Sequence, residues 1–209
     1  MELIRLNTVA LHARWLILEN PVNSFENSSD KLLDSVIKFN LKNLFTSLSE
    51  LYKFSERQLK SAINYNSVYF TKFLIEQYKF KLKSNNFYNI KITSFKFLKF
   101  LNDKNLKSKI KKEIFNSVAK GGKLDLVEFC HDNKYPWNED ICSAAAYSGH
   151  LDCLLYAHEN GCPWNETTCQ QNGHLKCLKY AIDNGCEYNL KKLKKLSKSK
   201  KIKNYLNTL

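Results

Sequence analysis

Proline and glycine are scarce in this sequence. Three of the 209 residues are prolines and six are glycines, and all six glycines lie between Gly121 and Gly185. These two residue types disfavour a helix interior more strongly than any others, so long stretches of the chain carry no helix breaker. Hydrophobic residues make up 44% of the chain and aromatic residues 13%, which is ample material for a packed core. The scarcity of breakers predicts an all-α chain.

Arginine is nearly absent. The net charge of +13 comes from thirty lysines and only three arginines, whereas proteins that read nucleic acids favour the planar guanidinium group. The composition is rich in Lys, Asn, Ile, Phe and Tyr, as is typical of proteins encoded by an AT-rich genome. Such a bias adds lysines and raises the pI without any selection for phosphate binding. The charge is also uneven, at +10 for residues 1–129, −5 for residues 130–189 and +8 for the last twenty. A basic groove along the whole molecule is therefore not expected.

Long apolar runs are missing near the N-terminus. The longest in residues 1–18 is Trp15–Leu18, far short of the roughly 20 residues that span a bilayer. Charged residues and a histidine interrupt any signal-peptide core there. We therefore expect an intracellular, cytoplasmic protein, with nuclear import through the lysine-rich tail as an alternative.

What the sequence does contain is an internal repeat. The string Gly149–Glu166 returns as Gly173–Asn189, with the shared pattern Gly-His-Leu-x-Cys-Leu-x-Tyr-Ala, and a weaker copy runs from Gly122 to Glu139. Such self-similarity at a fixed period is typical of stacked supersecondary units. The last copy lacks three residues between its cysteine and its histidine, which predicts a first helix about a turn shorter.

The frame of this repeat extends toward the N-terminus in degraded form. We expect equivalent helices to start at Val68, Phe95, Leu124, Leu151 and Leu175, which are 27, 29, 27 and 24 residues apart. Five residues after each start stands an aromatic (Phe73, Phe100, Phe129, Tyr156, Tyr180), and three after each stands Thr71, Leu98, Val127, Leu154 or Leu178. Apolar residues at this spacing predict one buried stripe on each helix.

Each unit is predicted to hold two short helices. In the best copy Asn138 is placed as an N-cap and Gly149 ends the first helix, while Leu151–Glu159 forms the second. A tryptophan before the cap and a cysteine within the helix, Trp137 with Cys142 and Trp164 with Cys169, are positioned as hydrophobic staples.

A family resemblance rests on these residues. Ala145–Asp152 followed by Asn160–Gly161 resembles the middle of an ankyrin repeat, and Gly161–Glu166 (Gly-Cys-Pro-Trp-Asn-Glu) resembles the divergent ankyrin-like arrays of giant viruses and some protists. The match is strong over residues 113–189 and faint over 54–112. The family's Thr-Pro-Leu-His opening is replaced by Asp140–Ser143, and the unit is shorter than 33 residues. The resemblance implies a solenoid of stacked helix-turn-helix repeats that binds another protein, in host cytoplasm if the chain is viral.

The expected organisation follows from the repeat. Residues 1–53 would form a helical N-terminal cap, with a polar loop reaching Asp30. Residues 54–189 would hold about five ankyrin-like repeats, at 54–80, 81–109, 110–136, 137–163 and 164–189, the first two degenerate. Residues 190–209 would form basic C-terminal capping helices, since a stack needs closed ends.

Seven cysteines and four histidines between residues 130 and 186 could indicate a metal site or a Cys–His nucleophile. Most of them, however, form pairs that occupy the same position in two successive repeats, as Cys142 and Cys169 do. Equivalent side chains in packed units lie roughly 10 Å apart, too far to share a metal at bond lengths of about 2 Å. Small buried thiols are the preferred interpretation, and we expect neither a metal nor another cofactor.

The candidate partner-binding residues are Trp137, Trp164, Tyr147 and Tyr188, because aromatic side chains are enriched at interaction hot spots. No catalytic motif is present, so the leading prediction is a non-enzymatic, monomeric interaction protein with an unidentified protein partner. The alternative is a nucleic-acid or anionic-membrane binder that uses the basic N-terminal part and the lysine-rich tail. A third interpretation, recruitment of a ubiquitin ligase by residues 1–53, lacks an F-box-like Leu-Pro-x-Glu opening.

Overall fold

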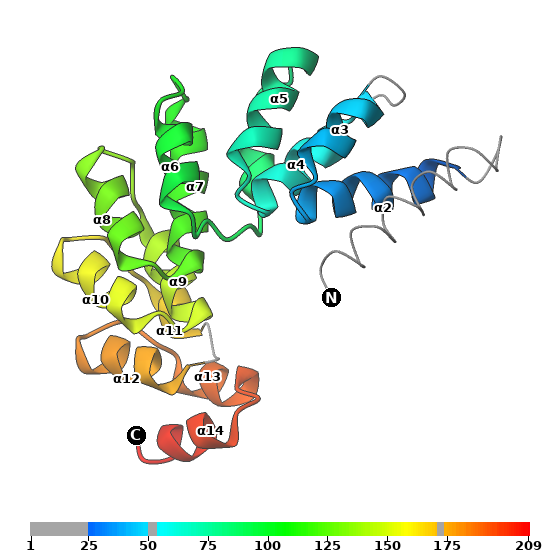
Figure 1. Cartoon of the computed structure of the whole chain (residues 1–209). Coiled ribbons are helices and arrows are strands. Elements are labelled where there is room, and N and C mark those ends of the chain that lie inside the picture. Colours follow the sequence, from blue (N-terminus) through cyan, green and yellow to red (C-terminus); the bar gives the residue numbers. More distant parts are fainter. Residues whose placement is uncertain (1–24, 50–53, 171–173) are drawn as a thin grey trace. The chain divides into compact units, whose positions relative to one another are not determined.

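The computed structural model describes residues 25–49, 54–170 and 174–209 (Figure 1). Throughout these ranges the regular structure is helical and no strand occurs, which confirms the all-α prediction. The chain divides into two compact units, one ending at Lys81 and one running from Leu82 to Leu209. The predicted repeat 54–80 therefore lies in the first unit, together with the region predicted as a cap.

Four described helices form the first unit: α2 (Phe25–Lys38), α3 (Lys42–Ser49), α4 (Glu56–Asn64) and α5 (Val68–Tyr78). Helix α2 contacts α3 and α4, and α4 contacts α5. The core between them is rich in fully buried apolar side chains (Val36, Ile37, Phe45, Leu59, Ile63, Phe70, Leu74). The predicted polar loop as far as Asp30 is wrong, because α2 begins at Phe25. Burial of the apolar stripe that starts at Leu32 outweighs the small helix penalty of Asn and Ser.

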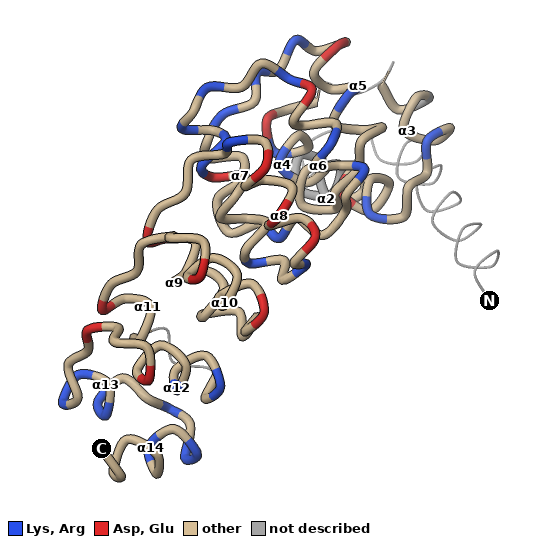
Figure 2. Tube along the Cα trace, turned by 90° about the vertical axis from the view of Figure 1, so that its left-hand side faces the viewer, with Lys and Arg blue, Asp and Glu red and all other residues tan. Residues whose placement is uncertain are grey.

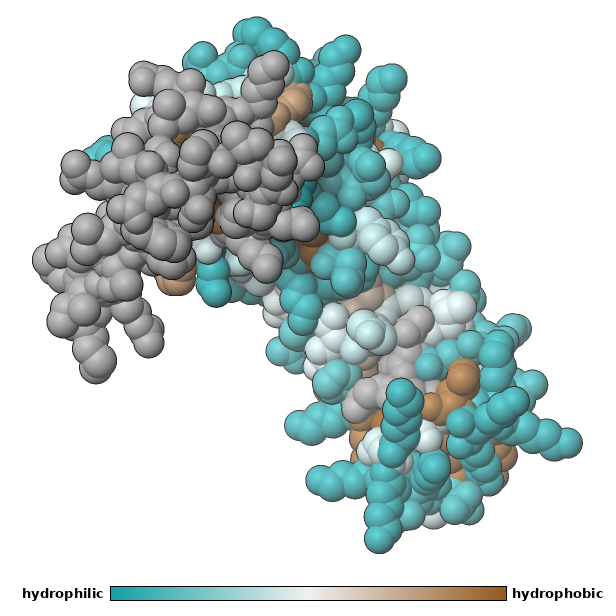
Figure 3. Space-filling model, turned by 90° about the vertical axis from the view of Figure 1, so that its right-hand side faces the viewer, coloured by the Kyte–Doolittle hydropathy of each residue, from teal (hydrophilic) through white to brown (hydrophobic). Residues whose placement is uncertain are grey.

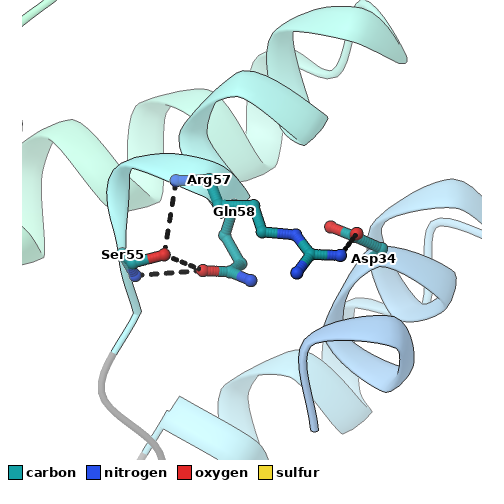
Figure 4. Close-up of polar contacts among 4 residues, drawn as sticks. All are labelled: Asp34, Ser55, Arg57 and Gln58. Carbon is teal, nitrogen blue, oxygen red and sulfur yellow. Dashed lines mark hydrogen bonds and ion pairs between the residues drawn. The ribbon is translucent and has the colours of Figure 1, made fainter. Parts of the chain in front are cut away.

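The start of α4 shows how local chemistry sets a boundary in this unit (Figure 4). Ser55 is the N-cap, and its Oγ accepts a hydrogen bond from the backbone N–H of Arg57 at 3.3 Å. Gln58 Oε1 in turn accepts from the Ser55 backbone N–H at 3.0 Å, which completes a capping box. The Arg57 guanidinium reaches Asp34 of α2 at 3.2 Å and links the two helices.

The second unit is built from successive helix pairs: α7 (Ser108–Gly121) with α8 (Leu124–Asp132), α9 (Glu139–Ser148) with α10 (Leu151–Glu159), α11 (Glu166–Gln170) with α12 (Leu175–Asp183), and α13 (Leu190–Leu196) with α14 (Lys200–Leu206). The first helices contact one another in the order α7, α9, α11, α13, and the second helices in the order α8, α10, α12 (Figure 1). The unit is thus two rows of helices with a core between the rows.

The predicted helix starts are confirmed. Val68, Phe95, Leu124, Leu151 and Leu175 are the first residues of α5, α6 (Phe95–Asn102), α8, α10 and α12. The residue three positions later is buried in every case, the polar Thr71 included. The aromatics five positions later are only partly buried. Position along the repeat therefore predicts which side of each helix faces the core.

One predicted repeat lacks its first helix. Residues 81–94 contain only a short 3-10 helix, η1 (Ser84–Phe87), followed by an irregular segment that leads into α6. The Asn86 side chain bonds the backbone N–H of Lys83 at 2.7 Å, Asn89 adopts a positive φ of 59°, and Ile90 and Ile92 are buried. Asparagine turns and β-branched residues favour such a segment over a helix. Ser117 of α7 stabilises it, since its hydroxyl bonds the Phe87 carbonyl and its carbonyl accepts from the Ile92 N–H, both at 2.9 Å.

Two details of the repeat bear on the predictions. Helix α11 has five described residues against ten in α9. The residues that follow it, 171–173, lie outside the described ranges, so the shorter first helix of the last copy stays a prediction. Asn138 does occupy the N-cap of α9, but its side chain makes no capping bond and instead donates to Asp140 Oδ2 at 2.7 Å. No helix of the described ranges combines the length and apolar character needed to cross a bilayer.

Candidate binding surface

Neighbouring helix pairs in the second unit are joined by a contact between a glycine and a histidine. Gly122 ends α7 in the left-handed conformation (φ 72°), and a Cβ built there would lie 2.2 Å from the imidazole of His150. Gly149, which ends α9, faces the ring of His174 in the same way. His150 Nε2 also lies 3.2 Å from the Lys120 carbonyl oxygen. Only glycine permits both the backbone angle and the approach of the ring.

A second recurring contact is a cluster of histidine, tryptophan and tyrosine. His131 stacks on Trp137 with ring centres 4.2 Å apart, and its Nδ1 lies 3.0 Å from the Tyr156 hydroxyl of the next pair. One pair further along, the same cluster recurs as His158, Trp164 and Tyr180, with 3.6 Å between the stacked rings and 3.0 Å to the hydroxyl.

The two candidate tryptophans are therefore half-buried against their own chain. Trp137 also stacks on Phe115 of α7, at 5.7 Å between ring centres. Trp164 packs against the buried cluster that contains Cys169, as a staple would. Their role in partner binding stays a prediction.

All seven cysteines are buried and unbridged, which confirms the interpretation as small buried thiols. Within one repeat, Cys142 Sγ lies 3.9 Å from the Cys162 carbonyl oxygen. The contact with Cys162 and burial raise the pKa of Cys142, and burial raises the pKa of Cys153 to about 11. These two thiols, held in the neutral form, are poor nucleophiles and poor metal ligands. Among the described residues no cluster of three metal-binding side chains occurs.

An open groove of about 430 Å³ lies on the row of first helices. Glu113, Asn116 and Lys120 recur along one face of α7, and Asp140, Ser143 and Tyr147 along one face of α9, because residues three and four apart share a helix face. Tyr88, from the irregular segment after η1, completes the lining. The groove therefore depends on the segment that replaces a helix in predicted repeat 81–109.

Two tyrosines dominate the exposed aromatic surface of this groove. Tyr88 is 70% exposed and Tyr147 61%. Lys120 Nζ lies 5.9 Å from the centre of the Tyr88 ring. Exposed tyrosines bring a large, rigid contact area with a polar end, and they lose little entropy on binding. The groove can thus accept a polypeptide segment that packs apolar groups on the rings and bonds with their hydroxyls.

A polar network holds one wall of the groove in place. Asp140 accepts from the Asn138 amide at 2.7 Å and pairs with Lys112 Nζ of α7 at 3.2 Å. The hydrogen bond from Asn138 lowers the pKa of Asp140, and Lys112 adds to the effect. Ser143 Oγ lies 2.8 Å from Thr167 Oγ1 of α11. These bonds tie α9 to both of its neighbours in the row.

The structure brings one of the four candidate residues into the groove. Tyr147 lines it, whereas Trp137 and Trp164 stand in the stacked clusters. Tyr188 is 39% exposed and lies in the segment before α13. Sequence reasoning missed Tyr88, because residues 81–94 do not follow the helical repeat and carry no periodic signal.

Charge is distributed unevenly over the second unit (Figure 2). Acidic residues mark the helices from α9 to α12, and lysines crowd α13 and α14. The chain matches no protein-family model, no curated protein and no solved structure.

Proposed function

We propose that this protein is a non-enzymatic, ankyrin-like repeat protein that binds a partner protein through the groove between α7, α9 and the Tyr88 segment. The observation that carries the proposal is the pair of largely exposed tyrosines, Tyr88 and Tyr147, lining one open groove. The protein would be monomeric and would need no cofactor.

Two further features support this proposal. The repeated glycine–histidine and histidine–tryptophan contacts hold successive helix pairs in a fixed relation, which is what a preorganised binding surface requires. The arrangement of helix pairs in two rows is also what the resemblance of Ala145–Asp152 to an ankyrin repeat implies. Repeat proteins use the extended surface of such a row for recognition.

Affinity purification from the native cell with three versions of the chain tests the proposal. We expect the wild type and Phe39→Ala/Tyr65→Ala to retain the same protein, and Tyr88→Ala/Tyr147→Ala to lose it by at least about tenfold, because a central aromatic contributes more than 1 kcal/mol when it is a hot spot. Phe39→Ala/Tyr65→Ala is the matched control, since it also removes two exposed aromatic side chains but takes them from the first unit.

The bound fraction should be quantified by mass spectrometry at low and physiological salt. Retention of the partner at physiological salt supports recognition through the groove. Equal capture by all three versions, or recovery of nucleic acid without a specific protein, contradicts it. Circular dichroism of each variant excludes misfolding as the cause of any loss.

A further inference from the structure

The C-terminal pair α13–α14 carries a concentration of unneutralised positive charge. Eight lysines between Lys191 and Lys203 are exposed, and residues 190–209 contain no carboxylate side chain. Among the ion pairs of the described residues, one involves this group, Lys192 with Glu166 at 3.6 Å. Figure 2 shows these lysines spread over both helices. The lysine face, as we call these eight side chains, meets solvent with little internal compensation.

The helices that carry the lysine face are firmly packed on their other side. Leu193, Ile202 and Leu206 are at most 1% exposed and belong to one cluster with Cys169, Leu178 and Ala181. Asn189 caps α13 by accepting from the Lys192 N–H at 3.0 Å. The lysines therefore lie on the solvent-facing side of ordered helices, because packing of the apolar side holds these helices in place.

Two leucines of the same C-terminal segment are exposed, one at the end of α13 and one after α14. Leu196 is 47% exposed and Leu209 49%. Figure 3 shows hydrophobic surface between hydrophilic side chains at this end of the unit. Lysines beside exposed apolar side chains match an anionic lipid surface, where ammonium groups meet the headgroups and apolar groups enter the interface.

The type of cation separates this ligand from nucleic acid. All eight charged side chains are lysines. An ammonium group acts as a point charge, which suits a fluid array of headgroups, whereas nucleic-acid recognition favours the bidentate arginine fork. Exposed leucines would also gain nothing against a phosphate backbone.

We propose that the lysine face of α13–α14, with Leu196 and Leu209, is a docking surface for a bilayer that contains anionic lipids. It adds to the partner-binding groove and does not depend on it. Binding of this kind is peripheral and reversible, because each lysine near such a surface contributes only about 1 kcal/mol.

Sedimentation with lipid vesicles tests this proposal on the full chain. We expect it to pellet with vesicles of phosphatidylcholine mixed with phosphatidylserine, to remain in solution with phosphatidylcholine alone, and to bind less as salt rises. Each lysine near the membrane changes partitioning about fivefold. If about half of the replaced side chains face the bilayer at once, K194Q/K195Q/K198Q/K201Q lowers partitioning about 25-fold.

A matched control separates local recognition from net charge. K96Q/K99Q/K107Q/K109Q removes the same charge from exposed lysines elsewhere in the second unit, and should leave binding within about twofold. Leu196→Ser/Leu209→Ser should lower binding several-fold at every salt concentration.

Three results overturn the proposal: an equal loss with the control set, no loss with the leucine variant, or tighter binding to duplex DNA than to the anionic vesicles. Tyr88→Ala/Tyr147→Ala should not alter vesicle binding, so failure of the groove and failure of the lysine face are distinguishable.

Discussion

Replacing Gly122 by alanine should destabilise the second unit more than the same change at Gly161. Both glycines have a positive φ, 72° and 80°, so both variants force an L-residue into the left-handed region at a cost of about 1–2 kcal/mol. Both also lower the entropy of the unfolded chain by a similar amount. The surroundings differ, because a Cβ at Gly161 meets nothing within 4 Å, whereas one at Gly122 lies 2.2 Å from the His150 ring.

The difference in free energy of unfolding between the two variants can be worked out from the contacts that His150 loses. Its ring must move by over 1 Å to reach ordinary van der Waals contact, which starts at 3.4 Å. That movement breaks the 3.2 Å hydrogen bond with the Lys120 carbonyl, worth about 1 kcal/mol, and disturbs the side-chain rotamer at a similar cost. Gly122→Ala should therefore lose about 1–3 kcal/mol more free energy of unfolding than Gly161→Ala.

Urea unfolding monitored by tryptophan fluorescence measures this difference. A Trp15→Phe background leaves Trp137 and Trp164, so the signal comes from the second unit alone. His150→Ala provides a double-mutant cycle, since removal of the ring should make Gly122→Ala cost about as much as Gly161→Ala. Equal losses for the two glycine variants, within about 0.5 kcal/mol, or an absence of coupling to His150 would refute the proposed interlock.

Three other predictions use the same assay. Gly121→Ala should be costly without any backbone strain, because its Cβ would lie 2.2 Å from the rigid Ile92 carbonyl oxygen; a loss below about 1 kcal/mol would contradict this packing. Tyr156→Phe should cost about 0.5–1.5 kcal/mol by removing the 3.0 Å bond with His131, and a neutral result would show that the bond adds nothing. Since Cys153 has its pKa raised to about 11, the unfolded chain loses this proton first. The neutral Cys153 thiol therefore contributes its full share of the free energy of unfolding below about pH 8.5. Between about pH 8.5 and pH 11 that contribution falls by up to about 1.4 kcal/mol per pH unit. Unfolding under reducing conditions at both ends of this window should show the decline, and Cys153→Ala should reduce it; an unchanged slope would refute the assignment.

The groove shows where sequence reasoning reaches its limit. Tyr147 could be predicted because it sits in the repeated part of the chain, where helix faces follow from spacing. Tyr88 could not, since it lies in a segment stabilised by contacts with α7 thirty residues away, such as the bond from Ser117 to the Phe87 carbonyl. Nothing in residues 81–94 alone indicates that they would line a groove with α9.

The local pattern by itself determined the all-α class, the first residue of helices such as α8 and α10, the left-handed glycine after α9 and the burial of the cysteines. Each of these depends on the spacing of side chains along a single helix or turn. Tertiary structure alone decided that His150 covers Gly122 and that Trp137 stacks on Phe115. It also decided that the Cys142 thiol meets the Cys162 carbonyl oxygen. The physical reason is that repeat periodicity specifies which face of a helix is buried, whereas the partner on that face depends on how neighbouring helix pairs pack in three dimensions.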